Sequence, residues 1–315
     1  MNLKVLGATG IQVSELAIGT WKYHGGVEPL QVGIEGGATF IDTAESYGTE
    51  QTVGEAILGI RSRVFVASKV SPRHFRYNDV IRAAECSLRQ LKTDYLDLYQ
   101  LHWPNYTVAL AETMAAMERL ADEGKIRFIG LSNFSVAEMK RAQGCLSRVR
   151  VVSNQVKYSL VCRDPEDGLL DYCKANRVSL LAFSPLATGP GVLARADGGD
   201  VLGQVAAEVG KTRAQVALNW CVARPEVIAI FKADRAEHVR ENCAASGWYL
   251  SSEQLARLSR GVKPVQNRSA IEQFGRRVAR RLVQYAGRSL GNPTAMDVEG
   301  RTSVSDTRPG APRSR

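Results

Sequence analysis

Four titratable side chains follow short apolar runs in the first third of this 315-residue chain. Asp42, Lys69 and His102 each stand at the end of such a run, and Tyr47 lies five residues after Asp42, in a polar turn closed by Gly48. If the runs are neighbouring parallel strands, all four side chains meet at one rim of the sheet. Gathering an acid, a base, a phenol and an imidazole costs stability, so such a cluster is typical of a catalytic site.

The chemistry that these four groups could do together is proton transfer to or from a carbonyl oxygen. A phenol is both a weak acid and a weak base at neutral pH, and a neighbouring ammonium such as that of Lys69 lowers its pKa. We interpret Tyr47 as a general acid or base tuned by Lys69, with Asp42 holding Lys69 and His102 orienting the carbonyl. No side chain delivers hydride, so a nicotinamide or similar cofactor is expected.

Eight short apolar runs recur along the chain, most of them about 25–30 residues apart, which is the size of a strand–helix unit. The stretches between them have helical periodicity, with apolar residues at spacings of three and four from Val80 to Leu91 and from Leu110 to Leu120. We predict an α/β fold, a (β/α)8 barrel with its site at the carboxyl ends of the strands. The runs are Leu16–Ile18, Thr39–Ile41, Val64–Ser68, Leu96–Leu101, Phe128–Leu131, Val151–Val152, Val178–Phe183 and Val227–Phe231.

Positive charge is concentrated toward the carboxyl end. The formal net charge is +9, and from Gly261 onward eleven Lys and Arg oppose four Asp and Glu, so the preceding part is nearly neutral. We divide the chain into a barrel over 1–262 and a basic extension over 263–315, with a helix over about 269–290 and disorder from Gly291. The apolar stripe of that helix would be Ile271, Phe274, Val278, Leu282 and Tyr285.

Composition favours a cytoplasmic protein. No apolar run is long enough to cross a membrane, and the amino-terminal segment lacks the hydrophobic stretch of a signal peptide. The six cysteines form no CxxC pattern, which favours reduced thiols over a disulfide framework or a zinc site. We therefore expect no metal.

Long motifs around the four residues resemble those of the aldo-keto reductases. They are FIDTAESYG from Phe40, Ser68-Lys69, DYLDLYQLHWP from Asp94, GKIR from Gly124 and GLSNF from Gly130. The resemblance runs from Met1 to about Lys263. It implies a barrel plugged by an amino-terminal hairpin, with its turn at Gly7–Gly10, and a catalytic tetrad of Asp42, Tyr47, Lys69 and His102 in which tyrosine is the proton donor. Histidine rather than glutamate at position 102 implies carbonyl chemistry instead of reduction of steroid double bonds.

The resemblance also implies a nicotinamide cofactor. It places Ser132, Asn133 and Gln155 at the carboxamide, and Phe183, followed by Ser184, on the nicotinamide ring. Tyrosine is usual at the position of Phe183, but stacking needs only the π-face. The remaining implied contacts are Leu186 and Thr188 along the pyrophosphate, Lys232 at the ribose 2′-phosphate, and Glu241 and Asn242 at the adenine. We also assign Arg235 to the 2′-phosphate and His238 to the adenine as cofactor-binding candidates.

The segment after the last predicted strand departs from the family pattern. Phe231 stands where proline is usual, Ala233 replaces a hydroxyl residue, and His238 replaces an arginine that packs on the adenine. Lys232 and Arg235 keep two cations for a 2′-phosphate, so NADP(H) is the expected cofactor and NAD(H) the alternative.

The predicted function is NADPH-dependent reduction of an aldehyde or ketone to an alcohol, with Trp21 and Trp103 as walls of the pocket for a small-molecule carbonyl. Two other functions stay open. One is a nucleotide-binding sensor or regulatory subunit that turns over carbonyls negligibly, and the other is an aldolase that uses Lys69 as a Schiff base. No specific nucleic-acid binding is expected, and for the basic extension we favour a packed helix over contact with an anionic surface.

Overall fold

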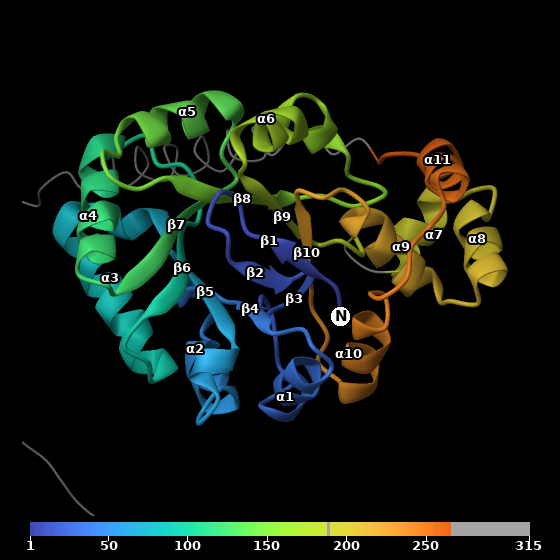
Figure 1. Cartoon of the computed structure of the whole chain (residues 1–315), viewed down its shortest axis with the longest axis horizontal. Coiled ribbons are helices and arrows are strands. Elements are labelled where there is room, and N and C mark those ends of the chain that lie inside the picture. The colour runs from blue at the N-terminus through green and yellow to red at the C-terminus, as the bar shows by residue number, and fades with distance from the viewer. Residues whose placement is uncertain (188–189, 266–315) are drawn as a thin grey trace, which may run out of the picture. The chain divides into compact units, whose positions relative to one another are not determined.

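Eight parallel strands form a closed barrel in which the last strand, β10, pairs with the first, β3 (Figure 1). The computed structural model describes residues 1–187 and 190–265, so Thr188, the helix expected over 269–290 and the disorder expected from Gly291 lie outside the described residues. Each predicted run forms a barrel strand, and the prediction of a (β/α)8 barrel is confirmed. The strands are β3 (Leu16–Gly19), β4 (Phe40–Asp42), β5 (Phe65–Val70), β6 (Leu96–Leu101), β7 (Ile126–Ser132), β8 (Val151–Lys157), β9 (Ser179–Phe183) and β10 (Val227–Phe231).

An antiparallel hairpin lies across one end of the barrel, and it confirms the predicted turn (Figure 1). Its strands are β1 (Leu3–Val5) and β2 (Gln12–Ser14). Gly7 has a φ of +52°, and a Cβ at this position would lie 2.5 Å from the main-chain oxygen of Val152, at the start of β8, so glycine is required. Leu6 and Val13 are buried with the apolar side chains inside the barrel. The hairpin therefore closes the amino-terminal end and leaves the site to the opposite end.

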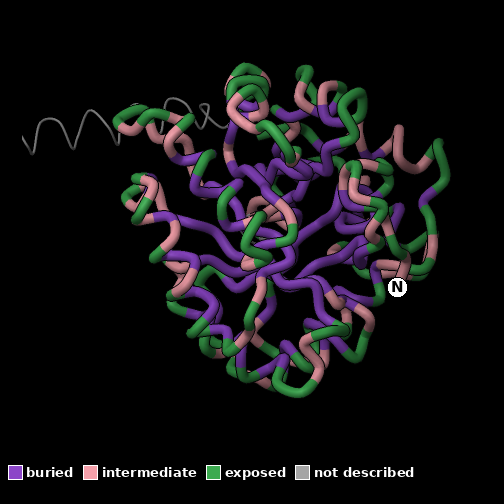
Figure 2. Tube along the Cα trace, turned by 60° about the vertical axis from the view of Figure 1, so that its left-hand side comes forward, coloured by how far each residue is buried: buried purple, intermediate pink, exposed green. Residues whose placement is uncertain are grey.

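Helices surround the barrel, and Figure 2 shows buried backbone converging in the strands with exposed segments around them. The apolar face of α3 recurs at spacings of three and four, as predicted, and includes Val80, Ala84 and Leu91. Several helices begin with a capping box, for example Ser135 with Glu138 in α5. The α-helices are α1 (Glu28–Glu35), α2 (Glu50–Ala56), α3 (Tyr77–Leu91), α4 (Leu110–Asp122), α5 (Val136–Gly144), α6 (Leu169–Asn176), α7 (Pro190–Ala196), α8 (Val201–Val209), α9 (Arg213–Val222), α10 (Ala236–Cys243) and α11 (Ser252–Gly261). The short 3-10 helices are η1 (Glu45–Tyr47), η2 (Arg61–Arg63), η3 (Pro72–His74) and η4 (Asp164–Glu166).

The alternation of side chains along the strands brings the polar residues together. Residues two apart on a strand point to the same face. Ala67 on β5 and Leu98 on β6 belong to the apolar layer inside the barrel. Two residues further along β5, Lys69 points to the same face as Ala67. In the same way Gln100 on β6, and His102 just after it, point to the same face as Leu98. The polar groups thus stand above an apolar layer, at the end opposite the hairpin.

Candidate active site

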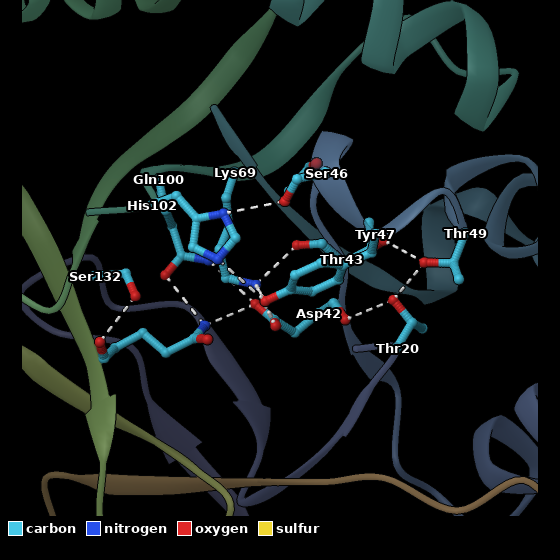
Figure 3. Close-up of polar contacts among 12 residues, drawn as sticks. Thr20, Asp42, Thr43, Ser46, Tyr47, Thr49, Lys69, Gln100, His102 and Ser132 are labelled. Carbon is cyan, nitrogen blue, oxygen red and sulfur yellow. Dashed lines mark hydrogen bonds and ion pairs between the residues drawn. The ribbon is translucent and has the colours of Figure 1, made fainter. Parts of the chain in front are cut away.

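A buried ion pair between Lys69 and Asp42 lies at the centre of the site (Figure 3). Lys69 Nζ donates to Asp42 Oδ2 at 2.6 Å and to the main-chain oxygen of Thr43 at 2.8 Å. The Lys69 side chain is fully buried, and Asp42 is 3% exposed. Because a buried ammonium without a partner would be very costly, the carboxylate is what allows a charge at this position.

Tyr47 lies over this ion pair, on the short helix η1 that follows β4. The turn after it is closed by Gly48, whose φ of +70° is in the left-handed region that favours glycine. Tyr47 Oη is 3.3 Å from Lys69 Nζ and 3.2 Å from His102 Nε2. The rings of Tyr47 and His102 meet edge to face, with centroids 5.4 Å apart. The structure therefore brings together all four residues that the sequence singled out.

The electrostatic balance at Tyr47 differs from the sequence-based expectation. Burial raises the pKa of the Tyr47 phenol, and although Lys69 lowers it as expected, Asp42 adds to the rise and the net direction is upward. Burial lowers the pKa of Lys69, but Asp42 and then Tyr47 outweigh burial, so that pKa lies above its ordinary value. The site at neutral pH thus contains a protonated phenol beside an ammonium.

His102 is a neutral imidazole at neutral pH. Burial, with a smaller contribution from the charge of Lys69, lowers the pKa of His102 to about 3. Its Nε2 faces the Tyr47 hydroxyl, and its Nδ1 lies 3.5 Å from Ser46 Oγ. A neutral imidazole carries one ring N–H and can direct a hydrogen bond to an oxygen, but it is a poor proton donor. The phenol is therefore the group with a proton to give.

The helix η1 is held to the segment after β5 by a contact that the sequence did not predict. Glu45 Oε1 accepts from the main-chain N–H of Ser71 at 2.5 Å, and both Glu45 oxygens lie 3.0 Å from His74 Nδ1. Because Tyr47 is on the same helix, this pair holds the phenol in place. No spacing rule links His74 to Glu45, which lies 29 residues away in the chain, so the sequence alone could not pair them.

The second carboxylate oxygen of Asp42 accepts two side-chain amides. Gln155 Nε2 donates to Oδ1 at 2.7 Å and Gln100 Nε2 donates to the same atom at 3.1 Å. Gln155 was predicted at the site, as a cofactor residue, whereas Gln100 was missed. The signal for Gln100 is a fully buried amide within an apolar strand, two residues before His102 and therefore on the same face.

The other residues predicted at the carboxamide join this network from β7. Asn133 has a φ of +65° and donates through Nδ2 to the main-chain oxygen of His102 at 3.1 Å and to Ser132 Oγ at 2.9 Å. Ser132 Oγ donates to the main-chain oxygen of Gln155 at 3.0 Å. Asparagine adopts left-handed backbone more readily than most residues, which explains its use at this turn.

The segment after β9 continues along the rim. Phe183 ends β9 and is partly buried, and Ser184 has a φ of +53°. Leu186 packs against the hydrophobic core as a partly buried side chain. Thr188, predicted along the pyrophosphate, lies outside the described residues.

Charged groups predicted at the ribose phosphate and adenine cluster after β10. Lys232 and Arg235 are exposed. Lys232 pairs with Asp234, and Arg235 pairs with Glu237 at 2.9 Å and contacts His238 Nε2 at 2.7 Å. The remaining residues of this group lie on α10, where His238 Nδ1 is 3.5 Å from Glu241 and Asn242 is buried.

The two tryptophans predicted as pocket walls both follow barrel strands at the same rim. Trp21 comes after β3, is 54% exposed, and carries the Lys22 ammonium 4.7 Å from its ring centroid. Trp103 follows β6 directly after His102 and is partly buried. Trp21 is therefore a surface residue of the rim and not part of the hydrophobic core.

The described part of the chain contains neither a candidate membrane span nor a candidate metal centre. None of its helices is both long and apolar enough to cross a membrane. Nowhere in residues 1–187 and 190–265 do three or more His, Cys, Asp or Glu side chains form a group that could hold a metal ion.

The barrel and the buried Lys–Asp pair beside a tyrosine and a histidine define a family, and comparison with known proteins agrees. The profile of the Aldo/keto reductase family matches residues 15–262. Methylglyoxal reductase YeaE of Escherichia coli (strain K12) is 38% identical over 288 residues, which cover 86% of this chain and 99% of that protein. Glyoxal reductase of Bacillus subtilis (strain 168) is 33% identical over 255 residues, or 79% of this chain and 89% of that protein.

Solved structures give the same result. A crystal structure of an aldo/keto reductase from Klebsiella pneumoniae, in complex with NADP and acetate, is 39% identical with a TM-score of 0.76. The match covers 84% of this chain and 97% of that chain. This chain belongs to the aldo/keto reductase family.

Proposed function

We propose that this protein reduces aldehydes or ketones to alcohols with NADPH, and that Tyr47 is the general acid. The observation that carries the proposal is the position of the Tyr47 hydroxyl, 3.3 Å from Lys69 Nζ and 3.2 Å from His102 Nε2. A carbonyl oxygen placed against this hydroxyl would receive a proton from the phenol and a hydrogen bond from the imidazole.

Each of the four residues then has a separate task. Tyr47 donates its proton as negative charge develops on the carbonyl oxygen. The Lys69 ammonium stabilises the phenolate that remains, and Asp42 holds that ammonium in place at 2.6 Å. His102, with its pKa lowered to about 3, stays neutral and fixes the direction of the carbonyl.

The donor set along the rim fits a nicotinamide dinucleotide, which when bound would supply the hydride that no side chain provides. The predicted carboxamide, ring and phosphate residues lie on or just after β7, β8, β9 and β10, which are consecutive neighbours in the barrel. Amides are found at β7 and β8, an aromatic ring at β9, and two exposed cations after β10. This order suits a ligand with a neutral amide at one end and phosphates at the other. The Klebsiella relative was solved with NADP, which is a ligand of this kind.

The two rival functions are weaker on specific grounds. An amine must be uncharged to form a Schiff base, whereas the pKa of Lys69 is raised and its Nζ is paired with Asp42. A sensor that only binds nucleotide would not need a protonated phenol beside a buried ammonium. The names of the E. coli and B. subtilis relatives make methylglyoxal and glyoxal the first substrates to test.

The test is a panel of carbonyl compounds, including both dicarbonyls and simple aldehydes and ketones, assayed at fixed NADPH and then at fixed NADH. We expect turnover of at least one carbonyl with NADPH and slower turnover with NADH. NADPH binding without measurable turnover on the whole panel would favour the sensor. Trapping of substrate on Lys69 by borohydride would favour the aldolase.

A further inference from the structure

Gln100 is buried inside the barrel and contacts the ion pair from below. It has no exposed surface, and its Nε2 donates to Asp42 Oδ1 at 3.1 Å while Lys69 holds the other carboxylate oxygen. A buried amide is kept only where its hydrogen bonds are made. The contact thus joins a residue outside the four to the carboxylate that positions Lys69.

The orientation of the Gln100 amide is determined by its neighbours. Gln155 Nε2 lies 3.4 Å from Gln100 Oε1 and donates to it. Reversing the amide would place its oxygen against the Asp42 carboxylate and its NH2 against the NH2 of Gln155, two repulsive contacts. Gln100 therefore presents an N–H to Asp42.

The barrel also makes room for this side chain. A Cβ at Gly130, on the adjacent strand β7, would lie 2.8 Å from Gln100 Cγ and 2.6 Å from Ser153 Oγ. Any larger residue would displace one of these side chains. Ser153, from β8, shares this space, but its Oγ has no hydrogen-bond partner among the described residues. Ser153 is therefore a neighbour of Gln100 that makes no hydrogen bond to Asp42, which makes it suitable as a control position.

We propose that Gln100 is a positioning residue that acts through Asp42, keeping the carboxylate turned toward Lys69 and screening part of its negative charge from Tyr47. The expected effect on kcat rests on the proposed function, whereas the contact between Gln100 and Asp42 does not. If the Gln155 side chain turns to hydrogen-bond a nicotinamide carboxamide, Gln100 still donates to Asp42 Oδ1.

The sign of the effect follows from the charges around Tyr47. The ionisable groups that face it are Lys69 from β5, Asp42 from β4 and His102 after β6, and Asp42 raises the Tyr47 pKa. Removing an N–H from Asp42 leaves more of its negative charge unscreened, which raises that pKa further and makes the phenol a weaker acid. The loss of activity at high pH, where the phenol ionises, should move upward.

The test uses Gln100→Met, which keeps the length and volume of the side chain but cannot donate. We expect kcat to fall by about tenfold, the effect of losing one charge-assisted hydrogen bond, with the KM for NADPH within about twofold. The high-pH limb of the kcat profile should shift to higher pH. Ser153→Ala, which alters the same space without touching Asp42, should leave the limb in place.

A double-mutant cycle with Asp42→Asn separates this role from packing. If Gln100 acts through the Asp42 charge, Gln100→Met should lower kcat by less than about twofold once Asp42 is replaced. Wild-type kcat and pH profile in Gln100→Met, or an undiminished loss in the Asp42→Asn background, would overturn the proposal.

The same double-mutant cycle can also be measured as thermal stability, which does not depend on catalysis. A failure of the Gln100 proposal can therefore be told apart from a failure of the proposed function. Melting temperatures of the same four proteins should show that Gln100→Met destabilises the wild type, where a buried carboxylate loses a donor, more than it destabilises Asp42→Asn. Equal destabilisation in both backgrounds would reject the Gln100–Asp42 coupling even if no carbonyl is ever reduced.

Discussion

Asn133 Nδ2 lies 3.1 Å from the main-chain oxygen of His102, so the turn after β7 is hydrogen-bonded to the residue that carries the imidazole. Asn133 also donates to Ser132 Oγ, which in turn donates to the main chain of Gln155. The residues predicted to hold the carboxamide and those predicted to hold the carbonyl therefore belong to one network. If the predicted residues hold the carboxamide, a bound nicotinamide would be placed relative to His102 by the same turn that is hydrogen-bonded to His102.

Replacing Tyr47 with phenylalanine should abolish most of the catalysis. Tyr47→Phe keeps the ring but removes the proton, so kcat should fall by at least about a hundredfold, the scale of a positioned general acid, while NADPH binding is retained. Steady-state kinetics and a fluorescence titration with NADPH measure the two effects. Tyr249→Phe, at a tyrosine that is 78% exposed, is the control. Wild-type turnover in Tyr47→Phe would end the assignment.

The depressed pKa of His102 should make the protein less stable in acid. The imidazole titrates near 6.5 when unfolded and near 3 when folded, so between these values only the unfolded chain binds the proton. Its contribution to stability is full above about pH 6.5 and is lost as the pH falls toward 3. Melting temperatures should therefore decline less over this window in His102→Gln than in the wild type. His24→Gln, at an exposed histidine, should follow the wild type; parallel curves for all three proteins would contradict the prediction.

The cations after β10 should distinguish NADPH from NADH. Replacing both Lys232 and Arg235 with alanine should weaken NADPH binding by about 1–3 kcal/mol, the effect of losing charge-assisted hydrogen bonds, and NADH binding much less. Titration of each cofactor gives the comparison. Arg148→Ala with Arg257→Ala, which removes one exposed and one partly exposed charge elsewhere, controls for net charge. Equal weakening of both cofactors would show that Lys232 and Arg235 do not read the 2′-phosphate.

Truncations should locate the apolar surface near the carboxyl end. The last described residues are bonded to the barrel unit: Val265 N–H donates to Val161 at 2.9 Å, and Arg163 donates to the main-chain oxygen of Val262 at 2.7 Å. Ending the chain after Lys263 removes the first bond and the apolar stripe expected over 269–290, so the melting temperature or solubility should fall. Ending it after Leu290 should leave stability and kinetics nearly unchanged.

The same truncations test the alternative role of the basic extension. If the stripe serves an anionic surface, the protein ending at Lys263 should be as stable as the full chain but should lose salt-sensitive binding to acidic liposomes or nucleic acid. Co-sedimentation with liposomes at low and high salt measures this. An unchanged melting temperature in the shorter protein would count against packing.

The sequence by itself determined the barrel and the four residues at its rim. Apolar runs, their spacing and the helical periodicity between them are local properties, and the carboxyl ends of parallel strands converge in any barrel. Asp42, Lys69 and His102 could therefore be placed from their positions at the ends of runs.

The tertiary structure alone decided how those residues are held and charged. Gln100 and Asp42 are 58 residues apart, and Glu45 and His74 are 29 apart, so no local pattern pairs them. The direction of the Tyr47 pKa also required the fold, because burial opposes Lys69 and only the packed structure shows that burial prevails. Contacts across the inside of a barrel depend on strand register and on the space left by residues such as Gly130. Neither property can be predicted from the residues adjacent in the sequence.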